Sequence, residues 1–143
     1  MSAPNTAKPR RTIWRSIGAV GAGFLTVVVL SLATDIVLHA LKVYPPWEQG
    51  LHDPALNVLA LSYRIVYTVL GGWLTARLAP NLPMRHVWIY GFIGLAMGTI
   101  GVVVTLPMNL GPAWYPILIA VTALPCAWLG GLLRRRAFGG GVR

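Results

Sequence analysis

Four long runs of apolar residues alternate with short polar or proline-rich links along the chain. The runs cover about residues 14–41, 56–79, 87–106 and 113–133. An α-helix rises roughly 1.5 Å per residue, so about 20 residues cross the ~30 Å hydrocarbon core of a bilayer. Each run reaches that length. The pattern therefore predicts an all-α protein, in which residues 13–136 form one four-helix transmembrane bundle.

The segments outside these runs lack the apolar periodicity of a packed helix. Residues 1–12 contain Pro4 and Pro9 and no apolar face, so we expect a disordered cytoplasmic tail. Residues 137–143 are rich in glycine, and we expect a flexible cytoplasmic tail there. The first apolar run exceeds the ~7–15 residues of a signal-peptide core, so we interpret it as a retained helix.

Composition supports a membrane environment and argues against nucleic acid as a partner. Hydrophobic residues make up 56% of the chain and charged residues only 10%, whereas soluble domains are about a quarter charged. The net charge of +9 would also suit nucleic-acid binding, but that function needs basic residues spread over a folded surface. Here the basic residues lie at the ends of apolar runs. The expected partner is therefore the lipid bilayer.

The basic residues are divided unequally between the two sides of the predicted bundle. Lys42 alone lies on one side, and Arg64 lies inside the second run. Because Lys and Arg are enriched in cytoplasmic segments, the side with the excess is expected to face the cytoplasm. This predicts a multi-pass protein of the bacterial plasma (inner) membrane with both termini in the cytoplasm. The residues in excess are Lys8, Arg10, Arg11, Arg15, Arg77, Arg85, Arg134, Arg135, Arg136 and Arg143.

Three ionisable residues inside the apolar runs form a candidate polar cluster. Asp35 and His39 are four residues apart in the first run, and Arg64 lies at a matching depth in the second. A charge within the membrane costs roughly 2.5–3.5 kcal/mol on insertion scales, so such groups pair or face a cavity. We predict an Asp35–Arg64 ion pair, with His39 and either Tyr63 or Tyr67 beside it. One interpretation is a structural clamp. The alternative is a proton or ion relay, or an anion site.

The link between the first and second runs, called here the outer link, offers weak candidates for a metal site. It contains no catalytic motif. Glu48, His52 and Asp53 cluster in sequence, and such side chains bind Zn²⁺. The link also contains prolines and lacks any recognised metal motif, so we expect no bound metal and no cofactor. Cys126 is the single cysteine, which excludes an intramolecular disulfide. No nucleophile motif of a known hydrolase is present, so we expect a protein that is not an enzyme.

Small residues predict how the helices pack. Glycines in the third run and small residues in the fourth follow spacings of three, seven and ten, which place each set on one helical face. We expect the third and fourth helices to pack on these faces; a dimer seam between two copies is the alternative. Pro125 should kink the fourth helix. The sets are Gly91, Gly94, Gly98 and Gly101, and Ala120, Ala123, Ala127 and Gly130.

A weak internal repeat accompanies this pattern. Residues 70–77 and 129–136 both follow L-G-G-x-L-x-x-R, so two weakly similar helical hairpins are one interpretation and chance is the other. His86 lies just before the third run, at the cytoplasmic start of that helix, where we expect it at the membrane interface.

Most of the chain resembles small, uncharacterised four-helix integral membrane proteins of bacteria. That group has no known activity, so the resemblance implies the fold and assigns no functional residue. The residues that carry it are Asp35, His39, Pro45-Pro46, Tyr63-Arg64, Gly71-Gly72, Ala79-Pro80, Pro83-Met84, Trp114-Tyr115 and Leu129-Gly130-Gly131.

Three functions remain open at this point. The first is a structural protein, or one accessory to a membrane partner, as a homo-oligomer or beside another membrane protein. The second is a subunit of a small oligomeric transporter or channel whose site is Asp35, His39 and Arg64. A membrane enzyme or metal-binding protein that uses the outer link is a weaker third.

Overall fold

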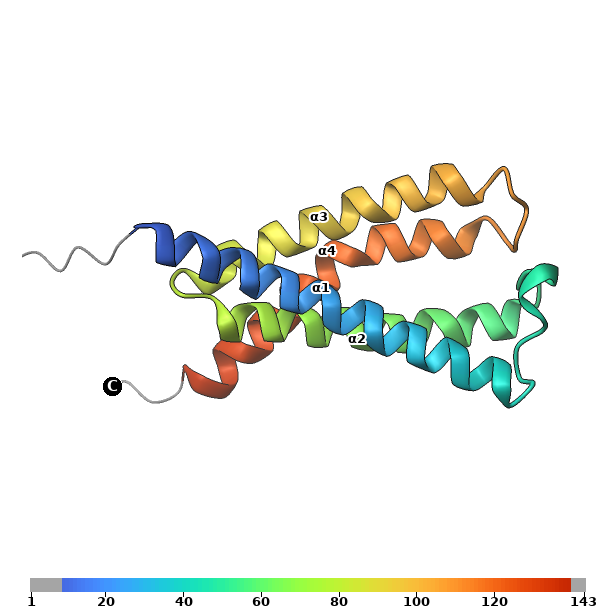
Figure 1. Cartoon of the computed structure of the whole chain (residues 1–143), viewed down its shortest axis with the longest axis horizontal. Coiled ribbons are helices and arrows are strands. Elements are labelled where there is room, and N and C mark those ends of the chain that lie inside the picture. The colour runs from blue at the N-terminus through green and yellow to red at the C-terminus, as the bar shows by residue number, and fades with distance from the viewer. Residues whose placement is uncertain (1–8, 140–143) are drawn as a thin grey trace, which may run out of the picture.

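The computed structural model describes residues 9–139 and consists, over that range, of four long helices joined by short links (Figure 1). Each helix is long and apolar enough to cross a membrane, which confirms the predicted all-α, four-helix class. A single turn of 3-10 helix, η1 (Trp47–Gln49), interrupts the first link. The helices are α1 (Pro9–Ala40), α2 (Pro54–Leu78), α3 (Pro83–Thr105) and α4 (Trp114–Phe138).

Three helix ends lie beyond the apolar runs that predict them. α1 begins at Pro9 and α3 at Pro83, because proline lacks only an N–H group that the first helical turn leaves unpaired anyway. α4 continues through its arginines to Phe138, since arginine is a good helix former. Part of each expected tail is therefore helical. The rest of those tails, residues 1–8 and 140–143, lies outside the described residues.

The start of α2 is fixed by its own capping residues. Asp53 Oδ1 accepts a hydrogen bond from the Ala55 N–H at 2.8 Å, and Pro54 occupies the first turn. Asn57 is buried, and its amide donates to the carbonyl oxygens of Leu51 (2.7 Å) and Asp53 (2.8 Å). These bonds hold the end of the first link against α2.

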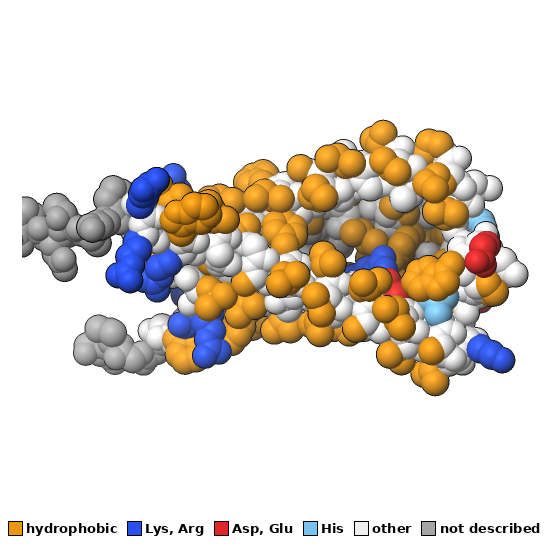
Figure 2. Space-filling view, in the orientation of Figure 1, with side chains coloured by type: hydrophobic (Ala, Val, Ile, Leu, Met, Phe, Trp, Pro, Cys, Tyr) orange, Lys and Arg blue, Asp and Glu red, His pale blue; other side chains and the backbone are white. Residues whose placement is uncertain are grey.

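The bundle has two distinct ends. The basic end carries the link between α2 and α3 together with the arginines of α4, and Lys and Arg side chains gather there in Figure 2. The loop end carries the links 41–53 and 106–113, and the acidic side chains visible in Figure 2 lie toward it.

α2 and α4 form the centre of the bundle, and α4 changes direction midway along its length (Figure 1). Pro125 lies inside α4, where the missing N–H and the ring clash with the preceding turn cause a bend. The half nearer the basic end crosses α2, whereas the half nearer the loop end follows α3. Between residues 9 and 139, α1 and α4 have no pair of Cα atoms within 8 Å of each other. The bundle is consequently spread open toward the loop end.

Small residues join α3 to α4 as predicted. A Cβ atom added at Gly98 would lie 2.8 Å from the Ala120 Cα, and one at Gly94 would lie 3.5 Å from the Ala123 Cβ. The backbones are therefore too close for a larger side chain at Gly98, whereas Gly94 makes an ordinary van der Waals contact. Gly101 differs, because a Cβ there would meet nothing within 4 Å.

One glycine from each Gly-Gly pair of the weak repeat, Gly72 and Gly130, lies where α2 crosses α4. A Cβ at Gly72 would lie 2.6 Å from the Ala127 carbonyl oxygen, and Gly130 packs against the α2 backbone. Gly71 occupies the position in the repeat that corresponds to Gly130, yet it packs against Gly23 of α1. The contacts therefore do not repeat position by position between the two hairpins.

A buried histidine joins α1 to α3 near the basic end. His86 is only 6% exposed, and its Nε2 lies 2.8 Å from the Ser16 hydroxyl. It is thus an internal residue of the bundle, in the first turn of α3. Phe24 packs on Tyr90 nearby, with ring centroids 4.8 Å apart.

Candidate functional site

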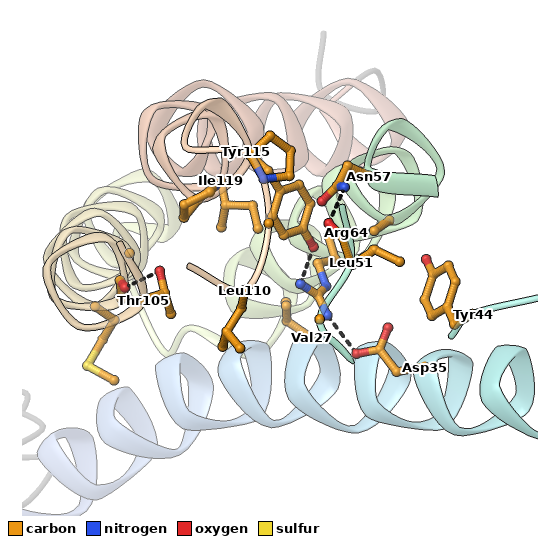
Figure 3. A pocket seen from close by; sticks show the side chains of 18 of the residues that line it. Val27, Asp35, Tyr44, Leu51, Asn57, Arg64, Thr105, Leu110, Tyr115 and Ile119 are labelled. Carbon is orange, nitrogen blue, oxygen red and sulfur yellow. Dashed lines mark hydrogen bonds and ion pairs between the residues drawn. The ribbon is translucent and has the colours of Figure 1, made fainter. Parts of the chain in front are cut away.

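An ion pair joins α1 and α2 toward the loop end, as predicted. Arg64 Nη2 donates to Asp35 Oδ2 at 2.6 Å. The other terminal nitrogen, Nη1, donates to the Tyr115 hydroxyl of α4. Figure 3 shows the Arg64 guanidinium between these two partners. One side chain of α2 therefore connects α1 to α4, two helices that do not approach each other directly.

Tyrosine hydroxyls complete the surroundings of the carboxylate. Tyr63 donates to Asp35 Oδ1, so both carboxylate oxygens have donors. The Tyr44 and Tyr63 hydroxyls are 3.2 Å apart, and burial raises the pKa of Tyr44. Tyr44 thus keeps its proton and can serve as a donor. Of the two tyrosines considered from the sequence, Tyr63 joins the pair, whereas Tyr67 bonds to Thr34 instead (2.8 Å).

His39 lies beside the cluster, but its hydrogen bond goes to the backbone. Its Nδ1 is 2.7 Å from the Asp35 carbonyl oxygen, within the same helix. Its ring stacks on Trp47, with centroids 3.6 Å apart and planes 7° from parallel. This arrangement places η1 against the end of α1. It gives His39 a role in holding the first link, and the described contacts include no bond from its ring to Arg64 or to the Asp35 carboxylate.

A cavity of about 590 Å³ lies beside the ion pair, where the bundle is spread open. Figure 2 shows it as a hollow on the face of the molecule, with one basic and one acidic side chain inside. The polar end is lined by Asp35, Arg64 and Tyr115, and His39 also lines the cavity. The remaining wall is mostly apolar. Its residues include Phe24, Val27, Met97, Gly101, Leu106 and Ile119.

The two links close the loop end of this cavity. The Leu51 N–H donates to the Leu110 carbonyl oxygen at 2.7 Å, and both residues line the cavity. Gly50 has φ +69°, a conformation that glycine adopts without strain, and a Cβ there would collide with Leu110. A Cβ at Gly111 would lie 2.5 Å from the Leu51 carbonyl oxygen. The links are thus closely packed against each other.

The weak metal candidates do not form a site. Over residues 9–139, no group of three or more His, Cys, Asp or Glu side chains is placed to hold a metal ion. Asp53 caps α2, and Glu48 lies in η1. His52 lies in the same link and belongs to no such group.

Sequence reasoning missed two members of the cluster. Neither Tyr44 nor Tyr115 was among the residues expected beside the ion pair, since Tyr44 follows the first apolar run and Tyr115 lies at the start of the fourth. Their position at the same end as Arg64 was the available signal, because a buried guanidinium needs more acceptors than one carboxylate supplies. Asn57 was also missed. It lies in the first turn of α2, where a buried amide commonly bonds to the preceding link.

No protein-family model, curated protein or solved structure matches this chain. The fold and the site therefore define its class: a four-helix protein, apolar enough for a membrane, with an ion pair at the end of an open cavity.

Proposed function

We propose that the chain is a small, non-enzymatic integral protein of the bacterial plasma membrane, structural or accessory to a membrane partner. Both termini are in the cytoplasm. Two features support this orientation. The basic side chains gather at one end of the bundle (Figure 2), and Lys42 is the lone Lys or Arg in the links at the other end. The resemblance to small four-helix bacterial membrane proteins points the same way.

The observation that carries the proposal is the bridge from Asp35 through Arg64 to Tyr115. It joins α1 to α4 across the part of the bundle where these helices are apart. Both carboxylate oxygens have donors, and two of the guanidinium nitrogens have acceptors. Groups held this way favour a mechanical role, because a charge locked in a pair is a poor carrier. The bridge would hold the two hairpins around the cavity.

The cavity keeps one alternative open. A small transporter or channel subunit could use Asp35, His39 and Arg64 as its site, since a cavity of about 590 Å³ could admit a small solute. Transport would require the pair to break and re-form during each cycle. The combined change Asp35→Asn with Arg64→Gln separates the two functions. Retained folding with loss of a measured solute flux in proteoliposomes would favour transport.

Topology and partnership are tested on the full chain. A reporter that is active only outside the cytoplasm should be active when it is fused after Gln49 or Gly111. A reporter that is active only in the cytoplasm should be active when it is fused at the C-terminus. Cytosolic behaviour of the first two would contradict the proposed orientation. Purification in mild detergent, followed by mass determination, should recover a stoichiometric second copy or another membrane protein. A monomer that recovers no protein partner after cross-linking in intact membranes would contradict the accessory role.

A further inference from the structure

The cavity opens on the side of the molecule that would face lipid. α1 and α3 meet near the basic end, through Ser16 and His86 and through Phe24 and Tyr90. Toward the loop end the two helices line opposite sides of the cavity, and Figure 2 shows the hollow between them from outside. An apolar space of this size beside a bilayer does not stay empty, because its walls would forfeit their dispersion contacts. Something from the membrane must fill it.

The wall of the cavity suits a hydrocarbon chain. Phe24 and Val27 of α1 line it together with Met97 of α3 and Ile119 of α4. Gly101 adds a bare stretch of wall, since a Cβ atom there would meet nothing within 4 Å. These groups offer shape and dispersion contact with few hydrogen bonds, which is what an acyl chain requires.

The polar end has N–H donors that make no hydrogen bond within the described chain. Asp35 receives hydrogen bonds on both oxygens. Arg64 has five N–H groups, of which those on Nη1 and Nη2 supply one hydrogen bond each, and its buried Nε has no partner in the described chain. The pair carries no net charge. The end of the cavity therefore favours an uncharged acceptor, such as an ester carbonyl, over a second anion.

We propose that this cavity binds one glycerophospholipid from the surrounding leaflet. One acyl chain lies along the apolar wall, and its ester carbonyl accepts a hydrogen bond from Arg64. The volume of about 590 Å³ is smaller than a whole two-chain phospholipid, so the second chain and the phosphate remain in the leaflet. The joined links at Leu51 and Leu110 close the loop end. A helix from a partner, which has to continue into water, would collide with them, whereas a lipid chain enters from the side and ends inside.

Substitution of one glycine tests this assignment without altering the ion pair. Gly101→Leu places its side chain in the cavity, and open space around Gly101 means that the helices need not move. Gly21→Leu is the matched control, because Gly21 also has nothing within 4 Å but lies on an exposed part of α1 away from the cavity. Each full-length variant would be purified in mild detergent and its bound lipid measured by native mass spectrometry. Far-UV circular dichroism would verify folding.

We expect one phospholipid per chain on the wild type and on Gly21→Leu. For Gly101→Leu we expect an affinity for phospholipid lower by roughly 5- to 150-fold, the effect typical of overfilling a packed site, and a correspondingly lower occupancy. If that variant fails to fold, Thr105→Phe replaces it, since Thr105 also lines the cavity.

Three results would overturn the proposal: no phospholipid on the wild type, equal occupancy on the cavity variants and the control, or an isoprenoid quinone in place of phospholipid. None of them depends on the Asp35–Arg64 clamp, which every variant retains.

Discussion

Breaking the Asp35–Arg64 pair from either side should cost more than removing both charges together. Arg64→Met keeps much of the side-chain length but leaves the Asp35 carboxylate without its cation. Asp35→Asn leaves the guanidinium without its anion. The double variant has neither charge, so no uncompensated charge remains inside the bundle.

The structure sets the size of the effect. The Asp35 and Arg64 side chains are 14% and 28% exposed, so solvent screens the pair only in part. Breaking a fully buried pair costs about 3–5 kcal/mol, and we discount this to about 2–3 kcal/mol for each single change. The double variant should recover part of that loss. Because the double variant should lose less than either single variant, the expected coupling energy is about 3 kcal/mol, at the upper end of the usual range for side chains in contact.

The assay is equilibrium unfolding in mixed micelles of mild detergent and sodium dodecyl sulfate, followed by far-UV circular dichroism. Arg77→Met serves as the control, because Arg77 lies at the basic end of α2 and stacks on Trp73 at 5.2 Å. Its free energy of unfolding should stay within about 0.5 kcal/mol of the wild type. Strictly additive losses at Asp35 and Arg64, or single variants as stable as the control, would refute the clamp.

Three further changes test other parts of the fold by the same unfolding assay. Gly72→Leu should separate α2 from α4 at Ala127 and lower the free energy of unfolding by about 2–3 kcal/mol. Gly18→Leu, in open space, should leave it unchanged, and equal effects of the two changes would contradict the close crossing of α2 and α4. Asp53→Ala removes the cap of α2 and should cost about 1 kcal/mol, and no loss would mean that the cap is dispensable. Tyr115→Phe removes one acceptor from Arg64 and should cost about 1–2 kcal/mol; an unchanged free energy of unfolding would exclude Tyr115 from the bridge.

Hydrophobic run length and charge determine most of what the sequence predicts correctly. A run of about 20 apolar residues has few alternatives to a membrane-spanning helix, because every backbone polar group must be satisfied within lipid. The Asp35–Arg64 pair follows from the same energetics. Two opposite charges at equal depth on adjacent helices each cost less when paired, so their partnership is visible without a structure.

The cavity and the contact of Arg64 with Tyr115 were not predictable in this way. Proline predicts a bend at Pro125, but it does not predict which helices separate as a result. That direction depends on the close approach of Gly72 and Gly130 at the crossing of α2 and α4, a contact between segments far apart in the chain. Only when α4 follows α3 does Tyr115 come to face Arg64. The helix ends also escaped prediction, because Pro9 and the arginines of α4 extend helices beyond their apolar runs.

The most direct test of the account measures the distance between α1 and α4 in a lipid bilayer. Spin labels at Val37 and Ile117, both exposed, would be placed in a Cys126→Ala background and the distance measured by pulsed electron paramagnetic resonance in nanodiscs. We predict a single narrow distribution that becomes broader and longer with Arg64→Met, because the bridge from Asp35 to Tyr115 is lost. A broad distance distribution in the protein that retains Arg64, or a distribution that Arg64→Met leaves unchanged, would contradict the proposed bridge between α1 and α4.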